Sequence, residues 1–120
     1  MDISGPQQDL LMKLMSASSS LRAKAIAGNV ANQNTPGYKR QDVRFEEALL
    51  EQLNKTNPDL QSVKVELIED LESPARSDGN NVQIEDEVGA MRENLIRYQL
   101  YANIVEGNTR LIEAAINGDR

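Results

Sequence analysis

The stretch Asn29-Val30-Ala31-Asn32-Gln33-Asn34-Thr35-Pro36-Gly37-Tyr38-Lys39-Arg40 decides the fold, because its residues specify the end of a helix and a change of chain direction. Pro36 fixes its own φ at about −65° and disfavours the helical region for the residue before it. Gly37 readily takes the positive φ that a type II turn requires at its third residue. Three asparagines nearby can bond the open carbonyls at a helix end. The stretch therefore predicts a helix end and a tight turn, although a bare Pro-Gly pair would indicate only an ordinary helix stop and loop.

Upstream of the turn, the sequence predicts a helix that has Asp9 as its N-cap and runs to about Asn32. Apolar and small residues recur along it at alternating spacings of three and four, which places them on one stripe. The stripe consists of Leu11, Leu14, Ser18, Leu21, Ala25 and Gly28. Because a run of serines weakens its intrinsic helix propensity, we expect this helix to need a packing partner.

Between the turn and the last third of the chain, the sequence predicts a short helix and a minor strand. Residues 42–53 have helical composition, and the apolar residues that share one face of this helix are Phe45, Leu49 and Leu53. Residues 62–68 alternate valine or leucine with charged residues, the pattern of a half-buried strand. A strand needs a partner, and the chain offers only a faint one. Residues 72–81 have the composition of a flexible linker.

The strongest periodic signal predicts a long helix over residues 82–120. Apolar residues recur there at steps of four and three, the period that holds one seam against a partner helix. The seam consists of Ile84, Val88, Met91, Leu95, Tyr98, Ala102, Val105, Thr109, Ile112 and Ile116. A second apolar flank consists of Leu100, Tyr101, Ile104 and Leu111. We expect the seam to pack on the N-terminal helix and the flank to contact other subunits; a bundle within the chain, filled by the helix at residues 42–53, is the alternative.

Composition argues against several functional classes. The formal charge of −6 and pI near 4.6 argue against a nucleic-acid partner, which normally requires a basic face. Neither cysteine nor histidine is present, so disulfides, thiolate metal sites and the commonest general base are absent. We therefore expect no enzymatic activity, no cofactor and no metal. No apolar run suits a membrane span, and no basic segment followed by an apolar core suggests a cleavable signal peptide.

Two acidic features have simpler interpretations than a chemical site. Asp78 and Asp86 do not have the spacing of a regular calcium loop, and a linker followed by a helix start explains them. Glu46 and Glu47 have no companion histidine or nucleophile, so a solvated helix face is the expected role. Lys39 and the following arginine either pair with an adjacent subunit or are solvated, and the sequence leaves both interpretations open.

Two motifs resemble those of the flagellar axial proteins, which build the bacterial rod, hook and junctions. The signature turn of that family is matched by Asn29, Ala31, Asn32, Thr35, Pro36, Gly37, Tyr38 and Lys39, and its continuation in the small proximal rod proteins by Asp42 and Phe45. The second motif consists of Asp78-Gly79-Asn80-Asn81-Val82, Glu87, Met91, Glu93-Asn94 and Tyr98-Gln99. Together they most resemble the FlgB type of flagellar basal-body rod protein.

The resemblance implies a mainly α fold in one rod-subunit domain of residues 1–120. Long N- and C-terminal helices, at residues 1–34 and 82–120, would pack antiparallel as a coiled-coil-like core around a short irregular or minor-β middle at residues 35–81. The implied function is a structural subunit of the proximal rod that polymerises through its terminal helices, helps to connect the base to the rod and transmits torque. The alternative is a cytoplasmic helical adaptor that binds one partner through the seam.

The resemblance also implies partners and a location. Other rod subunits and the adaptor protein of the basal body would be its neighbours in the periplasmic rod, and the flagellar type III export apparatus would carry it there. Phe45 and Leu49 resemble the Phe-x-x-x-aliphatic recognition motif of early export substrates. The same pair would equally form an ordinary apolar face that packs within the subunit, and both interpretations remain open at this point.

Overall fold

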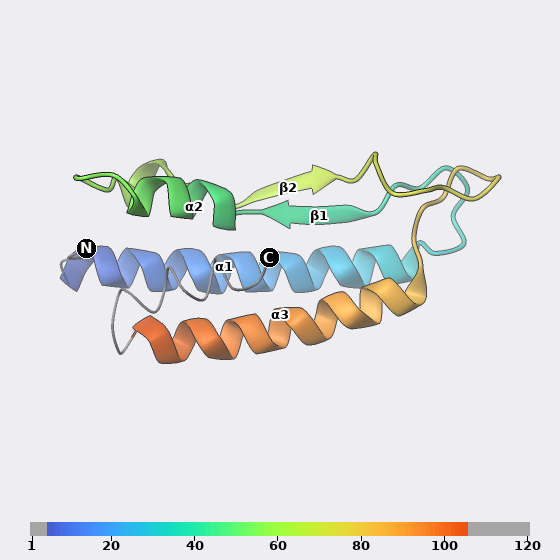
Figure 1. Cartoon of the computed structure of the whole chain (residues 1–120). Helices are drawn as coiled ribbons and strands as arrows, with labels where there is room; N and C mark the ends of the chain where they lie inside the picture. The colour runs from blue at the N-terminus through green and yellow to red at the C-terminus, as the bar shows by residue number, and fades with distance from the viewer. Residues whose placement is uncertain (1–4, 106–120) are drawn as a thin grey trace.

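Two long helices run antiparallel along the molecule and carry a second layer made of a small sheet and a short helix (Figure 1). The computed structural model describes residues 5–105, with side chains to residue 103. The elements in chain order are α1 (Gly5–Ala31), β1 (Gln41–Arg44), α2 (Glu46–Leu53), the 3₁₀ helix η1 (Leu60–Ser62), β2 (Glu66–Glu69) and α3 (Ile84–Val105). The mainly helical fold with long, mutually packed terminal helices and a minor sheet is thus confirmed.

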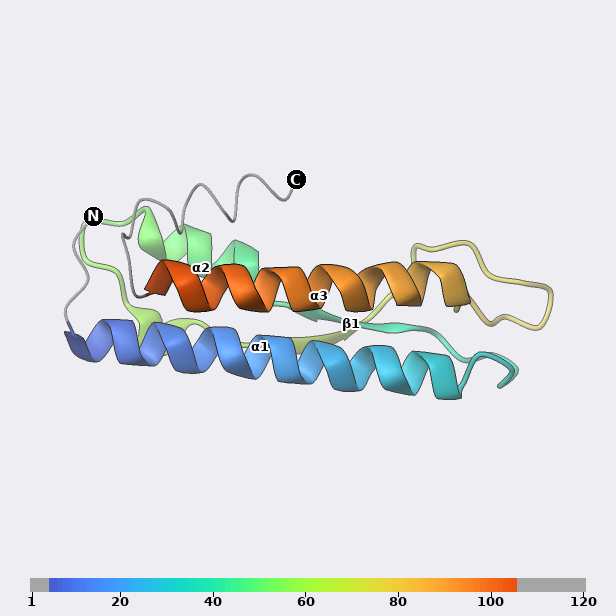
Figure 2. The same ribbon diagram turned by 90° about the horizontal axis from the view of Figure 1, so that it is seen from below.

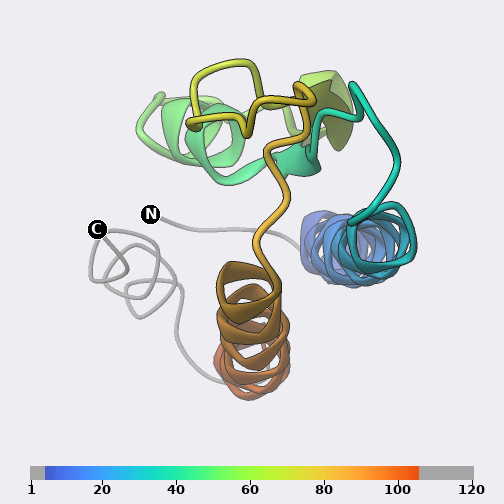
Figure 3. The ribbon, with the colours of Figure 1, turned by 90° about the vertical axis from the view of Figure 1, so that its right-hand side faces the viewer.

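The helices α1 and α3 lie side by side in two perpendicular views, and the sheet and α2 cover them on one side (Figures 1 and 2). Seen along the helix axes, α1, α3 and the second layer form a three-cornered arrangement (Figure 3). The interior lies between these three corners, where side chains from all of them meet.

Helix α1 begins at Gly5, ahead of the predicted N-cap. Pro6 is tolerated because the first turn of a helix has no use for its missing N–H. Asp9 consequently lies inside the helix, and its assignment as N-cap is wrong. The buried stripe is also centred differently from the predicted one, because it includes Met15, Arg22 and Asn29, which line up with Leu11 on the side that faces the second layer.

Residues 42–53 are not one helix, because their first part forms β1. β1 pairs antiparallel with β2, in a register that places Gln41 opposite Glu69 and Arg44 opposite Glu66. The chain leaves the strand at Phe45, with φ −153° and ψ −48°, and α2 begins at the next residue. The faint partner for the predicted strand is therefore β1, and the strand itself is shorter and later than residues 62–68.

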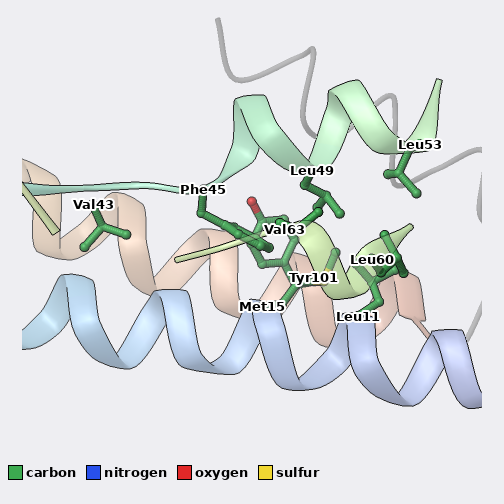
Figure 4. Close-up of a cluster of buried hydrophobic side chains, with 9 residues drawn as sticks. All are labelled: Leu11, Met15, Val43, Phe45, Leu49, Leu53, Leu60, Val63 and Tyr101. Atoms are coloured by element: carbon green, nitrogen blue, oxygen red, sulfur yellow. The ribbon is translucent and has the colours of Figure 1, made fainter. Parts of the chain in front are cut away.

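The hydrophobic core lies where α2 and η1 cover the helix pair (Figure 4). It consists of Leu11, Met15, Val43, Phe45, Leu49, Leu53, Leu60, Val63 and Tyr101. Each large side chain buried here contributes about 2 kcal/mol relative to an exposed position. The alternative in which α2 fills a bundle within the chain is correct for this part of the molecule.

Residues 72–81 are not a flexible linker. The Arg76 backbone donates to the Asn80 carbonyl at 2.8 Å, and the Gly79 amide donates back to the Arg76 carbonyl at 2.8 Å. Asn80 and Asn81 are buried. A closed loop of this kind fixes the distance and direction between the end of β2 and the start of α3.

Candidate functional site

The two motifs that carry the family resemblance meet in space, where α1 ends and α3 begins (Figure 1). We call this region the polar junction and define it by six side chains that bridge α1, the sheet, the closed loop and α3: Asn29, Arg40, Asp70, Asn80, Asn81 and Glu87. Four of them, the three asparagines and the glutamate, are buried. Buried polar groups of this kind stabilise a structure only when their hydrogen bonds are satisfied.

Residues 35–38 form the predicted turn, in which the Thr35 carbonyl accepts from the Tyr38 amide at 3.2 Å. Gly37 has φ +77°, so the predicted positive φ is confirmed. Its amide donates to the Asp78 carbonyl at 2.8 Å, which ties the turn to the closed loop. Gly79 has φ +88° and passes so close that a Cβ on it would lie 3.3 Å from the Gly37 Cα. The crossing therefore requires glycine on both segments.

Asn29 connects α1 to β1 and α3 through a fully buried amide. Its Oδ1 accepts from the Gln41 amide at 2.8 Å, and its Nδ2 donates to the Gln41 carbonyl at 2.9 Å. The same Nδ2 donates to Glu87 Oε2 at 3.1 Å, and the Tyr38 hydroxyl donates to Oδ1 at 3.3 Å. One side chain from the end of α1 thereby positions the strand, the turn and the first turns of α3.

Arg40 links two carboxylates across the junction. Its Nε donates to Glu87 Oε1 at 2.8 Å, and its Nη1 donates to Asp70 Oδ2 at 3.1 Å. Burial disfavours the charge on Arg40, yet the hydrogen bonds to both carboxylates raise its pKa above the ordinary value. The Ser73 hydroxyl and backbone, together with Arg40, donate to Asp70 and hold the pKa of that carboxyl well below its usual range. Glu87 is fully buried, and both Arg40 and Asn29 donate to its side-chain oxygens.

Asn80 fastens the closed loop to the end of α1. Its Nδ2 donates to the carbonyls of Asn32 and Thr35, at 2.9 Å and 2.8 Å. Its Oδ1 accepts from the Val82 amide at 2.7 Å. These bonds satisfy carbonyls that the helix end and the turn would otherwise leave open.

Asn81 extends the sheet by one side-chain amide. Its Oδ1 accepts from the Arg40 backbone amide at 2.7 Å, and its Nδ2 donates to the Asp70 carbonyl at 2.8 Å. The Asp70 amide donates to the Arg40 carbonyl at 2.9 Å, so the amide group of Asn81 stands between the two chains just beyond the β1–β2 ladder. The entry to α3 is thereby fixed to the sheet.

The remaining residues of the signature turn have smaller roles in the chain. Asn32 donates to the Gly28 carbonyl at 2.8 Å, and Lys39 donates to the carbonyl of Gly79. Ala31 and Pro36 are exposed. Lys39 and Arg40 were expected either to pair with an adjacent subunit or to be solvated. Both side chains instead bond within the subunit.

A second ionic cluster crosses the centre of the molecule. Arg22 Nη2 donates to Glu46 Oε1 at 2.7 Å, and the Tyr101 hydroxyl donates to Glu46 Oε2 at 3.2 Å. Arg97 Nη1 lies 3.8 Å from Glu46 Oε1. Burial and the negative charge of Glu46 raise the pKa of Tyr101. The interpretation of Glu46 as solvated is therefore wrong, whereas Glu47 is exposed.

The predicted seam of α3 lies mostly outside the packed face of the helix. Val88 is 44% exposed, Leu95 59% and Tyr98 48%, while Ile84 and Met91 are half-buried and Ala102 is exposed. The buried stripe of α3 consists instead of Glu87, Asn94 and Tyr101. The seam is thus not the face that packs on α1, and Tyr101 of the flank packs within the chain. The Val105 side chain, Thr109, Ile112 and Ile116 lie outside the described residues.

Of the described residues, no group of three or more carboxylates is placed to hold a metal ion. Within the same part of the chain, no helix combines the length and the apolar character needed to cross a membrane. The two clusters described above are assembled from paired charges and amides that bond one another.

Sequence reasoning did not assign Arg40, Asp70 and Glu87 to one site. The signal available was indirect: Arg40 follows the signature turn, and Glu87 belongs to the second motif. Their separation of 47 residues hides the contact. Asp70 lies in neither motif, and only the register of the sheet brings it to Arg40.

Comparisons with known proteins point to one family. No protein-family model matches the chain. A protein from Borreliella burgdorferi named flagellar basal body rod protein FlgB is 33% identical, over 71% of this chain and 77% of the relative. Proteins of the same name from Borrelia hermsii and Bacillus subtilis are 35% and 24% identical; the first match covers 71% of this chain and 77% of the relative, the second 98% and 97%. The chain therefore belongs to the FlgB family of flagellar basal body rod proteins.

Proposed function

We propose that this chain is a structural subunit of the flagellar basal-body rod and that it polymerises through the exposed seam of α3. The observation that carries the proposal is the exposure of three large apolar side chains, Val88, Leu95 and Tyr98, on one face of a long helix. They recur at the spacing by which helices hold a partner. An apolar face of this kind is stabilised when another protein covers it.

The polar junction supports this role because it orients the seam. Asn29 and Arg40 bond Glu87 at the start of α3, and the inward stripe of the helix packs on α1. With that side occupied, the seam lies outside the packed face of the described structure, where it is placed to contact a neighbour. Fixed helix orientation also suits a part that transmits torque, because load applied at one subunit face reaches the next through a stiff connection.

The family membership supports a fuller assignment. We place the subunit in the proximal part of the periplasmic rod, where it would help to connect the base to the rod and would contact the basal-body adaptor protein and other rod subunits. Its role is structural rather than enzymatic. The flagellar type III export apparatus would carry it from the cytoplasm.

The proposed export motif has a specific structural setting. Phe45 and Leu49 are both 0% exposed in the hydrophobic core. An export receptor can therefore reach them only before the subunit folds. The receptor would bind these two side chains in the unfolded chain, and folding would later bury them in the core of the subunit.

The assembly role is tested by charging the seam without disturbing the fold. Leu95→Asp places a carboxylate on the exposed seam, where it costs little in the free chain but much in an apolar contact. We expect the variant to unfold at the temperature of the parent and to leave cells without rods and without motility. Asn103→Asp adds the same charge to an exposed position of α3 outside the seam and serves as the matched control.

Two results separate the proposal from its alternatives. Normal rods in cells that carry Leu95→Asp would contradict assembly through the seam. A cytoplasmic adaptor would bind its partner through the same seam but would be absent from purified basal bodies, so recovery of the parent protein in basal bodies decides between the two functions.

A further inference from the structure

The two edges of the small sheet differ in whether side chains of the chain bond their backbone groups. The Arg40 carbonyl accepts a hydrogen bond from the Asp70 amide, and from this pair onward alternate residues of β1 direct their backbone groups to β2. The backbone groups of Gln41 and Val43 therefore point away from β2. Asn29 bonds both the amide and the carbonyl of Gln41. Arg22 donates to the Val43 carbonyl at 3.3 Å, and Asp42 accepts from the Val43 amide at 2.7 Å. The outer edge of β1 is therefore closed by side chains.

The outer edge of β2 is open. The register directs the backbone groups of Leu67 and Glu69 away from β1. Over residues 5–105, neither their amides nor their carbonyls have a hydrogen-bond partner. β2 also lies farther from α1 than β1 does, so no helix of the described structure covers this edge (Figure 1). An uncovered row of backbone donors and acceptors is a template for an added strand.

The surroundings of the open edge define what it can accept. Leu67 is 46% exposed and Leu71 is 72% exposed, which gives the edge two apolar side chains. Exposed carboxylates lie toward the Leu71 end of this stretch, where Glu69 is opposite the neutral Gln41 and Glu72 follows the strand; Glu66 is opposite Arg44, and Lys64 is exposed before the strand. Antiparallel pairing with a second copy of β2, with Leu67 opposite Glu69, would set Glu66 against Asp70, and like charges on facing strands are destabilising. Charge complementarity favours a basic partner instead.

We infer that the outer edge of β2 binds an extended segment of a partner protein as an added strand, and that this segment combines lysine or arginine with apolar residues. Backbone hydrogen bonds to Leu67 and Glu69 would hold the segment, and the carboxylates of Glu69 and Glu72 would select its charge. The surface is separate from the α3 seam, so this contact goes beyond the proposed assembly role and does not depend on it.

A short synthetic peptide that alternates lysine and valine is the probe, and the full chain is observed by amide hydrogen exchange. We expect the peptide to slow exchange at Leu67 and Glu69 and to leave Gln41 and Val43, which are already closed, unchanged. The Glu69 amide faces outward, so Glu69→Pro removes one donor of the open edge and no bond of the β1–β2 ladder. We expect this variant to bind about tenfold more weakly, the equivalent of about one hydrogen bond.

The matched variant Glu69→Gln keeps the donor and removes only the charge. We expect it to lose less affinity than Glu69→Pro, and its remaining binding to depend less on salt than that of the parent. Three results would overturn the inference: no change of exchange at Leu67 and Glu69, equal binding of a peptide that alternates aspartate and valine, or protection that grows with the concentration of the chain alone. None of these variants touches α3, so failure here leaves the assembly role untouched.

Discussion

Asparagine side chains act in this protein as additional peptide groups. Asn29 pairs with both backbone groups of Gln41, and Asn81 stands between the backbones of Arg40 and Asp70. A side-chain amide offers an N–H donor and a carbonyl acceptor side by side, as a peptide group does, so neither aspartate nor a hydrophobic residue could replace them without leaving a backbone group unpaired. The asparagines of the two motifs are thus explained by what they bond.

Two glycines of the junction give a prediction with a matched control. Gly37→Val places a β-branched side chain at φ +77°, and we expect it to lower the free energy of unfolding by about 1 to 2 kcal/mol or more. Gly79→Ala combines φ +88° with a Cβ contact of 3.3 Å and is expected to destabilise as well. Urea unfolding of purified variants measures both effects.

The control for the glycine variants is Gly89→Ala in α3. A Cβ there meets nothing within 4 Å, and alanine favours a helix by about 0.5 to 1 kcal/mol. We therefore expect this change to leave stability equal or higher. If all three substitutions had equal effects, the crossing at Gly37 would not be the constrained point.

The sequence predicts a residue's conformation or contact at this scale only when neighbouring residues in the chain determine it. The positive φ of Gly37 follows from its own neighbours in the chain, and it was predicted. The bond between Asn29 and Glu87 spans 58 residues and depends on how α1 and α3 meet. Local pattern cannot supply that contact, so the sequence does not predict the role of Glu87 even though the residue belongs to the second motif.

At the scale of elements, α3 shows why a seam can be assigned to the wrong partner. Its apolar residues follow a regular period, but its buried stripe contains Glu87 and Asn94, which pattern analysis assigns to solvent. Asn94 donates to the Ser19 carbonyl at 3.0 Å, so part of the contact with α1 is polar, although Asn94 Oδ1 and Ser19 Oγ are buried there without a hydrogen-bond partner. The periodicity predicted the helix correctly and left its partner undetermined.

β1 was predicted as part of a helix for a similar reason. Residues 41–44 have no strong strand pattern of their own. Asn29 and the pairing with β2 hold Gln41 and its neighbours extended, so tertiary contacts override local preference.

The end of the sheet gives a prediction for pH dependence. The lowered pKa of Asp70 means that its ionised form is favoured in the folded state, so its contribution to stability is present above about pH 4 and is lost as the pH falls. Asp70→Asn should destabilise the protein at neutral pH, and the difference from the parent should shrink in acid. Urea unfolding across the pH range measures this.

Glu72→Gln removes an exposed carboxylate close by and serves as the control. Its stability should follow that of the parent at every pH. A gap between Asp70→Asn and the parent that stayed constant down to about pH 2 would show that ionisation of Asp70 does not stabilise the junction.

At the scale of the whole molecule, burial of the proposed export motif permits a test that separates export from folding. In a strain that exports but cannot assemble rods, we expect Phe45→Ala and Leu49→Ala to remain in the cytoplasm at normal levels. Leu53→Ala removes a neighbouring core residue outside the motif. All three changes should lower stability by about 2 to 5 kcal/mol.

Because the three variants share the loss of core packing, only export distinguishes them. Leu53→Ala should reach the periplasm as the parent does. If Phe45→Ala and Leu49→Ala were also exported normally, or if Leu53→Ala were retained with them, the pair would belong to the fold alone.

The exposed seam is the feature of the folded chain that the proposed rod function uses, and the absence of cysteine makes it directly measurable. Leu95→Cys introduces one thiol on the seam, and Glu93→Cys places one on the opposite side of α3. Labelling with a water-soluble maleimide is compared between the free chain and purified basal bodies. We predict that Leu95→Cys reacts readily in the free chain and is protected in the rod, with reactivity restored when the rod is dissociated. Equal reactivity of Leu95→Cys in the free chain and in intact rods would contradict assembly through the α3 seam.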